Sequence, residues 1–290
     1  MIKLLALDLD GTLLDSAGKV PETNILAIRN AERAGVLVTL ATGRRFRDAS
    51  VVAKEVRFNA PIVTHNGALI KFVDSLETVS ATLLPPETAG KIIEIGKKLG
   101  FEPLVSTDPN GWGKMFYDKI GDENLPLKKY FAWAITIHGR DAKGSLIKID
   151  DVLEIVGSEE IIHISFSGKC LEMNNLQTEL KMQLEGAATV LATEYPKRDF
   201  TLLDILSPDA SKGIALSRLA TSKNLASKNV MVIGDNYNDL EMLNFAGVPV
   251  VMGNAEPGLL EGTEFYTTLS NDENGVAAAI EKFILGELNG

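Results

Sequence analysis

The sequence predicts an α/β protein, in which a parallel β-sheet flanked by helices forms a core and a second, α+β domain is inserted into it. Three observations predict this fold. Short apolar segments alternate with amphipathic helical segments at both ends of the chain, polar residues directly follow several apolar segments, and a long middle region breaks the alternation. With 290 residues, 45% hydrophobic and 23% charged, the chain can bury one large core or two smaller ones.

The first part of the chain alternates strands and helices. Lys3–Leu7 is an apolar strand, and a helix then begins at Pro21, because proline is tolerated in a first helical turn, and ends at Gly35. The apolar run Val36–Ala41 is typical of a strand buried on both faces of a parallel sheet. The segment Pro61–Gly67 repeats this pattern and also ends in polar residues. These units predict a parallel sheet.

The last part of the chain follows the same order. A helix begins at Lys212, Asn229–Asp235 is a strand, and Asn238–Gly247 is a short helix that ends in glycine. A further strand follows over Val248–Asn254. A final helix over Gly275–Leu285 has its apolar residues on one stripe.

The middle region is different, because its short strand-like runs are not followed by clusters of polar residues. We therefore expect residues 1–84 and 206–290 to form the α/β core and residues 85–205 to form an inserted α+β cap domain. Its expected elements are a helix over Thr88–Leu99, strands over Phe131–Ile137, Ile161–Phe166 and Thr189–Tyr195, and a helix over Leu176–Leu184.

Charge and composition limit the partners and the location. The net charge of −10 and the pI near 4.9 predict repulsion of nucleic acid and of anionic membranes. The single cysteine cannot form an internal disulfide, no apolar run is long enough to span a membrane, and Asp8 interrupts the start too early for a signal peptide. We therefore expect a cytoplasmic protein; the sequence does not indicate its oligomeric state.

Polar residues follow four of the predicted strands. Each group alone is compatible with a simple turn, because Asp, Asn, Gly and Thr all favour turns. Ligands of an open parallel sheet bind beyond the carboxyl ends of its strands, however, so four groups at one edge favour a binding site. The groups are Asp8 and Asp10; Thr42, Gly43 and Arg44; His65, Asn66 and Gly67; and Gly234, Asp235, Asn238 and Asp239.

The types of side chain indicate a metal ion and a phosphate. Asp8 and Asp10 are two positions apart on a strand end, so both carboxylates point the same way and repel each other. A divalent cation cancels that repulsion, and carboxylates without histidine or cysteine suit Mg²⁺. The candidate ligands are Asp8, Asp10, Asp235 and Asp239, while Thr42, Arg44 and Lys212 supply donors and positive charge for a phosphate. A carboxylate can also attack phosphorus and form an aspartyl-phosphate.

The motifs "DLDGTLL", "LATGR", "SKG" and "GDNYNDLEML" have the order and spacing of the four motifs of the haloacid dehalogenase superfamily, which the chain resembles. The insert after the second motif, with "NGA" at Asn66–Ala68 and "VVMGNA" at Val250–Ala255, is similar to the Cof-type sugar-phosphatase branch. The resemblance covers both core segments and implies a Rossmann-like sheet. The insert is matched mainly by its position and length.

The resemblance implies a role for each motif residue. Asp8 is the implied nucleophile, and Asp10 the implied general acid and base, whose backbone carbonyl also touches the metal. An intact Asp-x-Asp pair favours a phosphatase or phosphomutase over a dehalogenase or an ion pump. Thr42 and Lys212 are implied to hold the phosphoryl oxygens, with Gly43 beside them, and Asn238 is implied to bind phosphate or to orient the other residues. Asp235 is implied to bind the metal directly, Asp239 directly or through water, and Arg44 and Asn66 are possible substrate contacts.

The sequence therefore predicts a Mg²⁺-dependent phosphatase of small phosphorylated metabolites, sugar phosphates by preference, with a cap that supplies specificity. A sugar-phosphate mutase is the main alternative, although only Arg140 and Arg198 in the insert could hold a reorienting bisphosphate. A non-catalytic protein that binds a phosphorylated ligand is the second. A signalling receiver domain is disfavoured, because this chain is more than twice as long as such a domain and its aspartates have Asp-x-Asp spacing. The substrate itself stays open.

Overall fold

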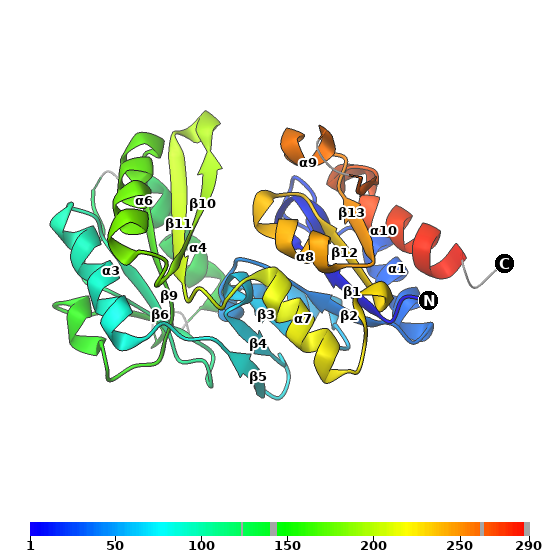
Figure 1. Cartoon of the computed structure of the whole chain (residues 1–290), viewed down its shortest axis with the longest axis horizontal. Coiled ribbons are helices and arrows are strands. Elements are labelled where there is room, and N and C mark those ends of the chain that lie inside the picture. The colour runs from blue at the N-terminus through cyan, green and yellow to red at the C-terminus, as the bar shows by residue number, and fades with distance from the viewer. Residues whose placement is uncertain (123, 140–143, 262–263, 287–290) are drawn as a thin grey trace. The chain divides into compact units, whose positions relative to one another are not determined.

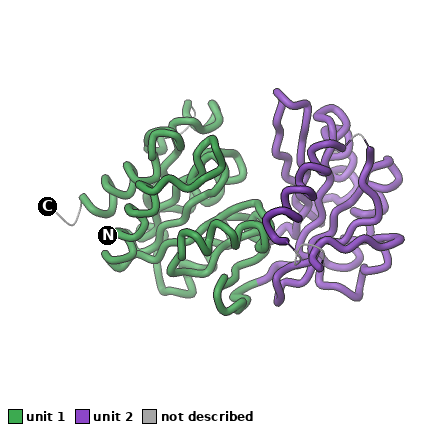
Figure 2. The backbone as a smooth tube through the Cα atoms, turned by 180° about the vertical axis from the view of Figure 1, so that it is seen from behind, with its two compact units in different colours: residues 1–80, 211–290 green, residues 81–210 purple. Residues whose placement is uncertain are grey.

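The computed structural model describes residues 1–122, 124–139, 144–261 and 264–286. Contacts between Cα atoms divide the chain into two compact units, which Figure 2 shows in different colours. The core unit consists of Met1–Ser80 and Ser211–Gly290, and the inserted unit of Ala81–Ala210. The boundaries expected from the sequence, after residue 84 and before residue 206, fall a few residues inside the inserted unit.

A five-stranded sheet in the order β14-β13-β12-β1-β2 forms the centre of the core unit, and all its pairings are parallel (Figure 1). β1 lies between β12 and β2, and all four of its residues are fully buried, as its apolar sequence predicts. The predicted α/β class with a parallel core is confirmed. The strands are β1 (Leu4–Leu7), β2 (Leu37–Leu40), β12 (Val230–Gly234), β13 (Val248–Val251) and β14 (Tyr266–Thr267).

Helices connect these strands and cover the sheet. Leu4 and Ala6 of β1 pack in one apolar cluster with residues of α7 and α8, and α1 and α10 pack against each other. Because strand side chains alternate, Leu5 and Leu7 point to the opposite face, so β1 is enclosed on both sides. The helices are α1 (Glu22–Arg33), α2 (Phe46–Val56), α7 (Lys212–Ser222), α8 (Leu240–Phe245), α9 (Pro257–Glu261) and α10 (Gly275–Ile280).

A small three-stranded sheet adjoins the end of β2. It contains β3 (Ile62–Thr64), β4 (Leu69–Lys71) and β5 (Thr78–Ala81), and β3 makes a parallel bridge from Val63 to Ala41, the residue after β2. The carboxyl end of β3 therefore reaches the same edge as the carboxyl ends of β1 and β2. This places the turn after β3 close to the residues that follow β2.

The inserted unit is a six-stranded sheet in the order β10-β11-β9-β6-β7-β8, antiparallel except between β7 and β8. Residues of α3 and α6 share an apolar cluster with the central strands. The α+β prediction for this unit agrees with the structure. Its elements are α3 (Pro86–Lys98), β6 (Leu104–Thr107), β7 (Lys114–Tyr117), α4 (Leu125–His138), β8 (Leu146–Lys148), β9 (Ile161–Gly168), α6 (Cys170–Leu184), β10 (Thr189–Tyr195) and β11 (Phe200–Leu206).

The strand predicted over residues 131–137 is wrong, because these residues belong to helix α4. The side chain of Asn124 accepts a hydrogen bond from the Leu127 amide at 3.2 Å and caps the helix start. The run is apolar on almost every position, so its seven residues carried no clear period. Three buried residues nevertheless recur at helical spacing: Leu127, Phe131 and Ala134.

Two further sequence observations bear on the fold. Within the described ranges, none of the helices combines the length and apolar character needed to cross a bilayer. Of the two arginines noted in the insert, Arg198 ends the short turn Pro196–Arg198, and Arg140 lies outside the described residues.

The packing of α3 generates a prediction with an internal control. A β-carbon added at Gly96 would lie 2.2 Å from the Phe166 ring, whereas one added at Gly90 would lie 3.7 Å from Val156. Gly96→Ala should therefore destabilise the protein by about 1–3 kcal/mol through overpacking. Gly90→Ala should stabilise it by up to about 1 kcal/mol through helix propensity. Thermal unfolding of both variants checks this, and equal midpoints would contradict the described packing.

Candidate active site

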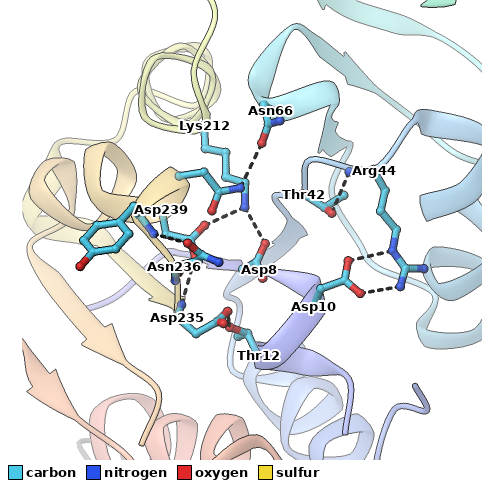
Figure 3. Close-up of polar contacts among 12 residues, drawn as sticks. Asp8, Asp10, Thr12, Thr42, Arg44, Asn66, Lys212, Asp235, Asn236 and Asp239 are labelled. Atoms are coloured by element: carbon cyan, nitrogen blue, oxygen red, sulfur yellow. Dashed lines mark hydrogen bonds and ion pairs between the residues drawn. The ribbon is translucent and has the colours of Figure 1, made fainter. Parts of the chain in front are cut away.

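Three aspartates converge at the carboxyl edge of the core sheet. Asp8 follows β1 and donates its amide to the Ile233 carbonyl at 3.0 Å, while Asp235 follows the neighbouring strand β12. Asp239 lies one turn further along the chain and is fully buried. One carboxylate oxygen from each of these aspartates lies within 4.8 Å of the others. The parallel pairing of β1 with β12 therefore joins two ends of the sequence into one acidic cluster (Figure 3).

Lys212, the first residue of α7, points into this cluster. Its Nζ donates to Asp8 Oδ1 at 2.6 Å and to Asp239 Oδ1 at 2.7 Å. Only 1% of the residue is exposed. Burial alone would lower the pKa of Lys212, but Asp239 and Asp8 outweigh it and raise that pKa, so the side chain stays charged.

Asp239 is held by the backbone of its own loop. Its Oδ2 accepts the amides of Asp235 at 3.0 Å and of Asn236 at 3.1 Å, while its Oδ1 accepts from Lys212. Both oxygens of Asp239 are therefore occupied by donors. A β-carbon at Gly234 would lie 2.7 Å from Asp239 Oδ2, so the loop needs glycine there.

Thr12 also belongs to the site, which the sequence did not indicate. The sequence around Thr12 favours a role as a cap of the turn after β1. Instead, its Oγ1 donates to Asp235 Oδ1 at 2.8 Å, although the two residues are 223 positions apart. The Leu9–Leu13 turn makes this possible, because Gly11 has φ +85° and a β-carbon there would lie 2.4 Å from Asp235 Oδ2. The sequence feature that could have identified Thr12 as a site residue is its position two residues after the Asp-x-Asp pair.

The cluster is electrostatically unfavourable in the absence of a cation. Burial, followed by repulsion from Asp239, raises the pKa of Asp235 to about 7. Burial also raises the pKa of Asp8 well above its ordinary value, although Lys212 opposes that shift. One ammonium thus faces three carboxylates, of which Asp8 and Asp239 are buried and Asp235 is half-buried.

Asp10 lies apart from the cluster. Its carboxylate forms a two-bond ion pair with Arg44, with Nε–Oδ2 at 2.8 Å and Nη2–Oδ1 at 2.6 Å, and 57% of the Asp10 side chain is exposed. Figure 3 shows this carboxylate directed to Arg44 and away from Asp8. The expectation that the two carboxylates point the same way is wrong, because the chain leaves β1 at Leu7 and turns.

The residues that follow β2 contact those that follow β3, since the Asn66 amide donates to the Thr42 carbonyl at 3.1 Å. Thr42 is buried, and its Oγ1 accepts the Arg44 amide at 3.1 Å. Asn238 donates through Nδ2 to Asn66 Oδ1 at 3.1 Å, which joins the fourth motif to the turn after β3. A β-carbon at Gly43 would lie 2.9 Å from Asn66 Oδ1, so the two segments approach closely.

The turn after β3 is built from left-handed residues. His65, Asn66 and Gly67 have φ of +52°, +50° and +97°. Such a conformation is unfavourable for non-glycine residues, so tertiary contacts must hold it. One such contact is the Phe46 amide, which donates to His65 Nε2 at 3.1 Å. A β-carbon at Gly67 would lie 2.0 Å from the Ser211 carbonyl, which seats this turn against the start of α7.

The donor set fits a hard divalent cation. Asp8, Asp235 and Asp239 offer only carboxylate oxygens, and Asp8 and Asp235 have raised pKa values that a cation would lower. Lys212 bonds to Oδ1 of Asp8 and Thr12 bonds to Oδ1 of Asp235. The Oδ2 atoms of both residues take no part in these two bonds and could face a cation.

Comparisons with known proteins agree with this site. The family described as haloacid dehalogenase-like hydrolase matches residues 5–280. The 5-amino-6-(5-phospho-D-ribitylamino)uracil phosphatase YwtE of Bacillus subtilis is 31% identical over 99% of both chains, and the HMP-PP phosphatase of Serratia proteamaculans is 27% identical over 89% of this chain and 86% of that one. The crystal structure of a haloacid dehalogenase-like hydrolase from Bacteroides thetaiotaomicron superposes with a TM-score of 0.79 and 28% identity, over 98% of this chain and all of that one.

The site and the match across the core and the insert define a phosphoryl-transfer hydrolase. The chain belongs to the haloacid dehalogenase-like hydrolases, as the motifs predict, and within them it is a phosphatase.

The raised pKa of Asp235 generates a prediction about stability. The folded protein holds the Asp235 proton up to about pH 7, whereas the unfolded chain loses it near pH 4, so stability falls as pH rises between these values. In metal-free protein, Asp235→Asn should raise the free energy of unfolding at pH 8 by on the order of 2 kcal/mol and flatten this decline. Chemical denaturation at pH 5.5 and 8 measures the effect.

Asp150→Asn, which removes an exposed carboxylate of the inserted unit, is the control and should leave the pH dependence unchanged. Addition of Mg²⁺ should stabilise the wild type at pH 8 but not Asp235→Asn. A wild-type protein that is equally stable at both pH values would contradict the described electrostatics.

Proposed function

We propose that the protein is a Mg²⁺-dependent phosphatase that hydrolyses small phosphate monoesters through a phosphorylated Asp8. The observation that carries the proposal is the position of Asp8. Its carboxylate lies at a strand end, is almost fully buried, and is bonded to Lys212 within a cluster of three carboxylates. A cation at this cluster and the Lys212 ammonium together would neutralise both the nucleophile and a phosphoryl group beside it.

The metal site would be formed by Asp8 and Asp235, with the backbone carbonyl of Asp10. We assign Asp239 a supporting role, because Lys212 and two amides already engage its oxygens. The ion would supply charge neutralisation when bound. Thr12 fixes the orientation of Asp235.

In the first step, an oxygen of Asp8 attacks phosphorus, the bond from phosphorus to the leaving oxygen breaks, and Asp10 gives that oxygen a proton. Asp10 must turn away from Arg44 to do so, because their two-bond ion pair occupies its carboxylate. Lys212, the Thr42 hydroxyl, the Gly43 amide and Asn238 would hold the phosphoryl oxygens.

In the second step, water attacks phosphorus and Asp10 takes a proton from it. The bond between phosphorus and the Asp8 oxygen breaks, which releases inorganic phosphate and restores the carboxylate. Asp10 then carries the proton that the next leaving oxygen requires. Arg44 would orient the Asp10 side chain between turnovers, and Asn66 would keep Asn238 in place through their hydrogen bond.

We propose that the leaving group is a small polyol or sugar and that the inserted unit, residues 81–210, selects it. The relatives named above support this size of substrate, since one is named for a phosphorylated ribitylamino-uracil. The relatives are phosphatases, which favours hydrolysis over the mutase alternative.

Replacement of the two motif aspartates tests the chemistry. Asp8→Asn should abolish release of phosphate from p-nitrophenyl phosphate, and Asp10→Asn should lower kcat by about 10²–10⁴-fold, since general acid–base catalysis contributes that much. Asp15→Asn is the matched control, because Asp15 accepts amides in an exposed turn of the same segment and should leave kcat unchanged. Full activity of Asp8→Asn would refute the nucleophile assignment.

A panel of phosphorylated metabolites tests the reaction class. We expect release of inorganic phosphate from sugar phosphates or from 5-amino-6-(5-phospho-D-ribitylamino)uracil, and no interconversion of sugar 1- and 6-phosphates. Comparing kcat/KM across the panel separates one dominant substrate from a broad profile. Isomerised sugar phosphate without phosphate release would instead support the mutase.

A further inference from the structure

Asn254, in the "VVMGNA" motif after β13, joins two other loops of the core unit. Its Nδ2 donates to the Gly11 carbonyl at 2.8 Å, and its Oδ1 accepts the Asn271 amide at 2.9 Å. Asn271 in turn donates through Nδ2 to the Leu14 carbonyl at 2.9 Å. Two asparagines therefore hold the turn after β1 at its middle and at its end.

The loop that carries Asn254 is also bonded to the strand end that carries Asp235. The Glu256 amide donates to the Asp235 carbonyl, and the Met252 amide to the Gly234 carbonyl, both at 3.0 Å. Gly11 itself lies against the Asp235 carboxylate, with no space for a β-carbon. The loop thus bonds to the backbone on both sides of the contact between Gly11 and Asp235.

We propose that Asn254 is a positioning residue for the metal site. By holding the Gly11 carbonyl, it fixes the peptide between Gly11 and Thr12 and hence the separation of the first and fourth motifs. The Thr12 bond to Asp235 spans the same gap, so a change in the turn would move a carboxylate of the cluster. This inference rests on the proposed function in one respect: both take Asp8 and Asp235 to bind a cation.

The test measures metal binding directly. Binding of Mn²⁺ to metal-free protein is followed by the EPR signal of the free ion, without any substrate. Asn254→Ala should weaken Mn²⁺ binding by about 10-fold, as loss of a partner that orients a ligand typically does. The Mg²⁺ concentration for half-maximal phosphatase activity should rise in parallel, with KM at saturating Mg²⁺ changed less than 2-fold, roughly, because substrate contacts persist.

Asn59 provides a matched control in the same unit. Its side chain makes the same pair of backbone contacts, accepting the Val38 amide at 2.8 Å and donating to the Val36 carbonyl at 3.0 Å, but at the amino end of β2, opposite the edge that carries the site. Asn59→Ala should lower the unfolding temperature without changing Mn²⁺ affinity. Asn254→Ser, whose hydroxyl is too short to reach both partners, should weaken Mn²⁺ binding as Asn254→Ala does.

Wild-type Mn²⁺ affinity in Asn254→Ala and Asn254→Ser, or an equal loss in Asn59→Ala, would overturn the positioning role. If the wild type binds Mn²⁺ but hydrolyses no phosphate ester, the proposed function fails while this inference is still tested. If the wild-type protein does not bind Mn²⁺, both the proposed function and the positioning role of Asn254 are refuted.

Discussion

The ion pair between Lys212 and the buried pair Asp8 and Asp239 is the interaction on which the site depends. With all three carboxylates ionised, the single ammonium would leave two net negative charges in a largely buried site. Burial, followed by the charges of the neighbouring carboxylates, therefore raises the pKa values of Asp8 and Asp235, although Lys212 opposes the shift. Such a cluster lowers the stability of the fold unless a bound cation neutralises its charge. The surrounding amides and Thr12 hold it in place against that repulsion.

Parallel pairing explains why this cluster could be predicted from the sequence. A continuous apolar run followed by Asp8, and another followed by Asp235, predict two buried parallel strands whose ends share an edge. The structure pairs those two strands directly, and it places Lys212 at the start of the helix that the sequence predicts there. Local signals were sufficient because each residue lies at an element boundary.

Other features depend on contacts that no local pattern records. The ion pair between Asp10 and Arg44 joins residues 34 positions apart and turns a carboxylate away from the direction that strand alternation predicts. The left-handed backbone conformation of His65 is stabilised by the hydrogen bond from the Phe46 amide to its side chain. Local sequence propensities do not indicate this conformation, because Phe46 is distant in the sequence. The sequence predicts a strand and not a helix over residues 131–137, because almost all of these residues are apolar and show no helical period. Only the burial of Phe131 and Ala134 in the structure has that period.

The central claim, that Asp8 carries the phosphoryl group, is tested most directly by trapping the intermediate. Borohydride reduces an acyl-phosphate to an alcohol, so quenching the protein during turnover with substrate and Mg²⁺ should convert Asp8 to homoserine, detected by mass spectrometry of its peptide. The conversion should require both substrate and Mg²⁺ and leave Asp10 and Asp235 intact. Homoserine at another aspartate, or unmodified Asp8 while phosphate is being released, would contradict the account.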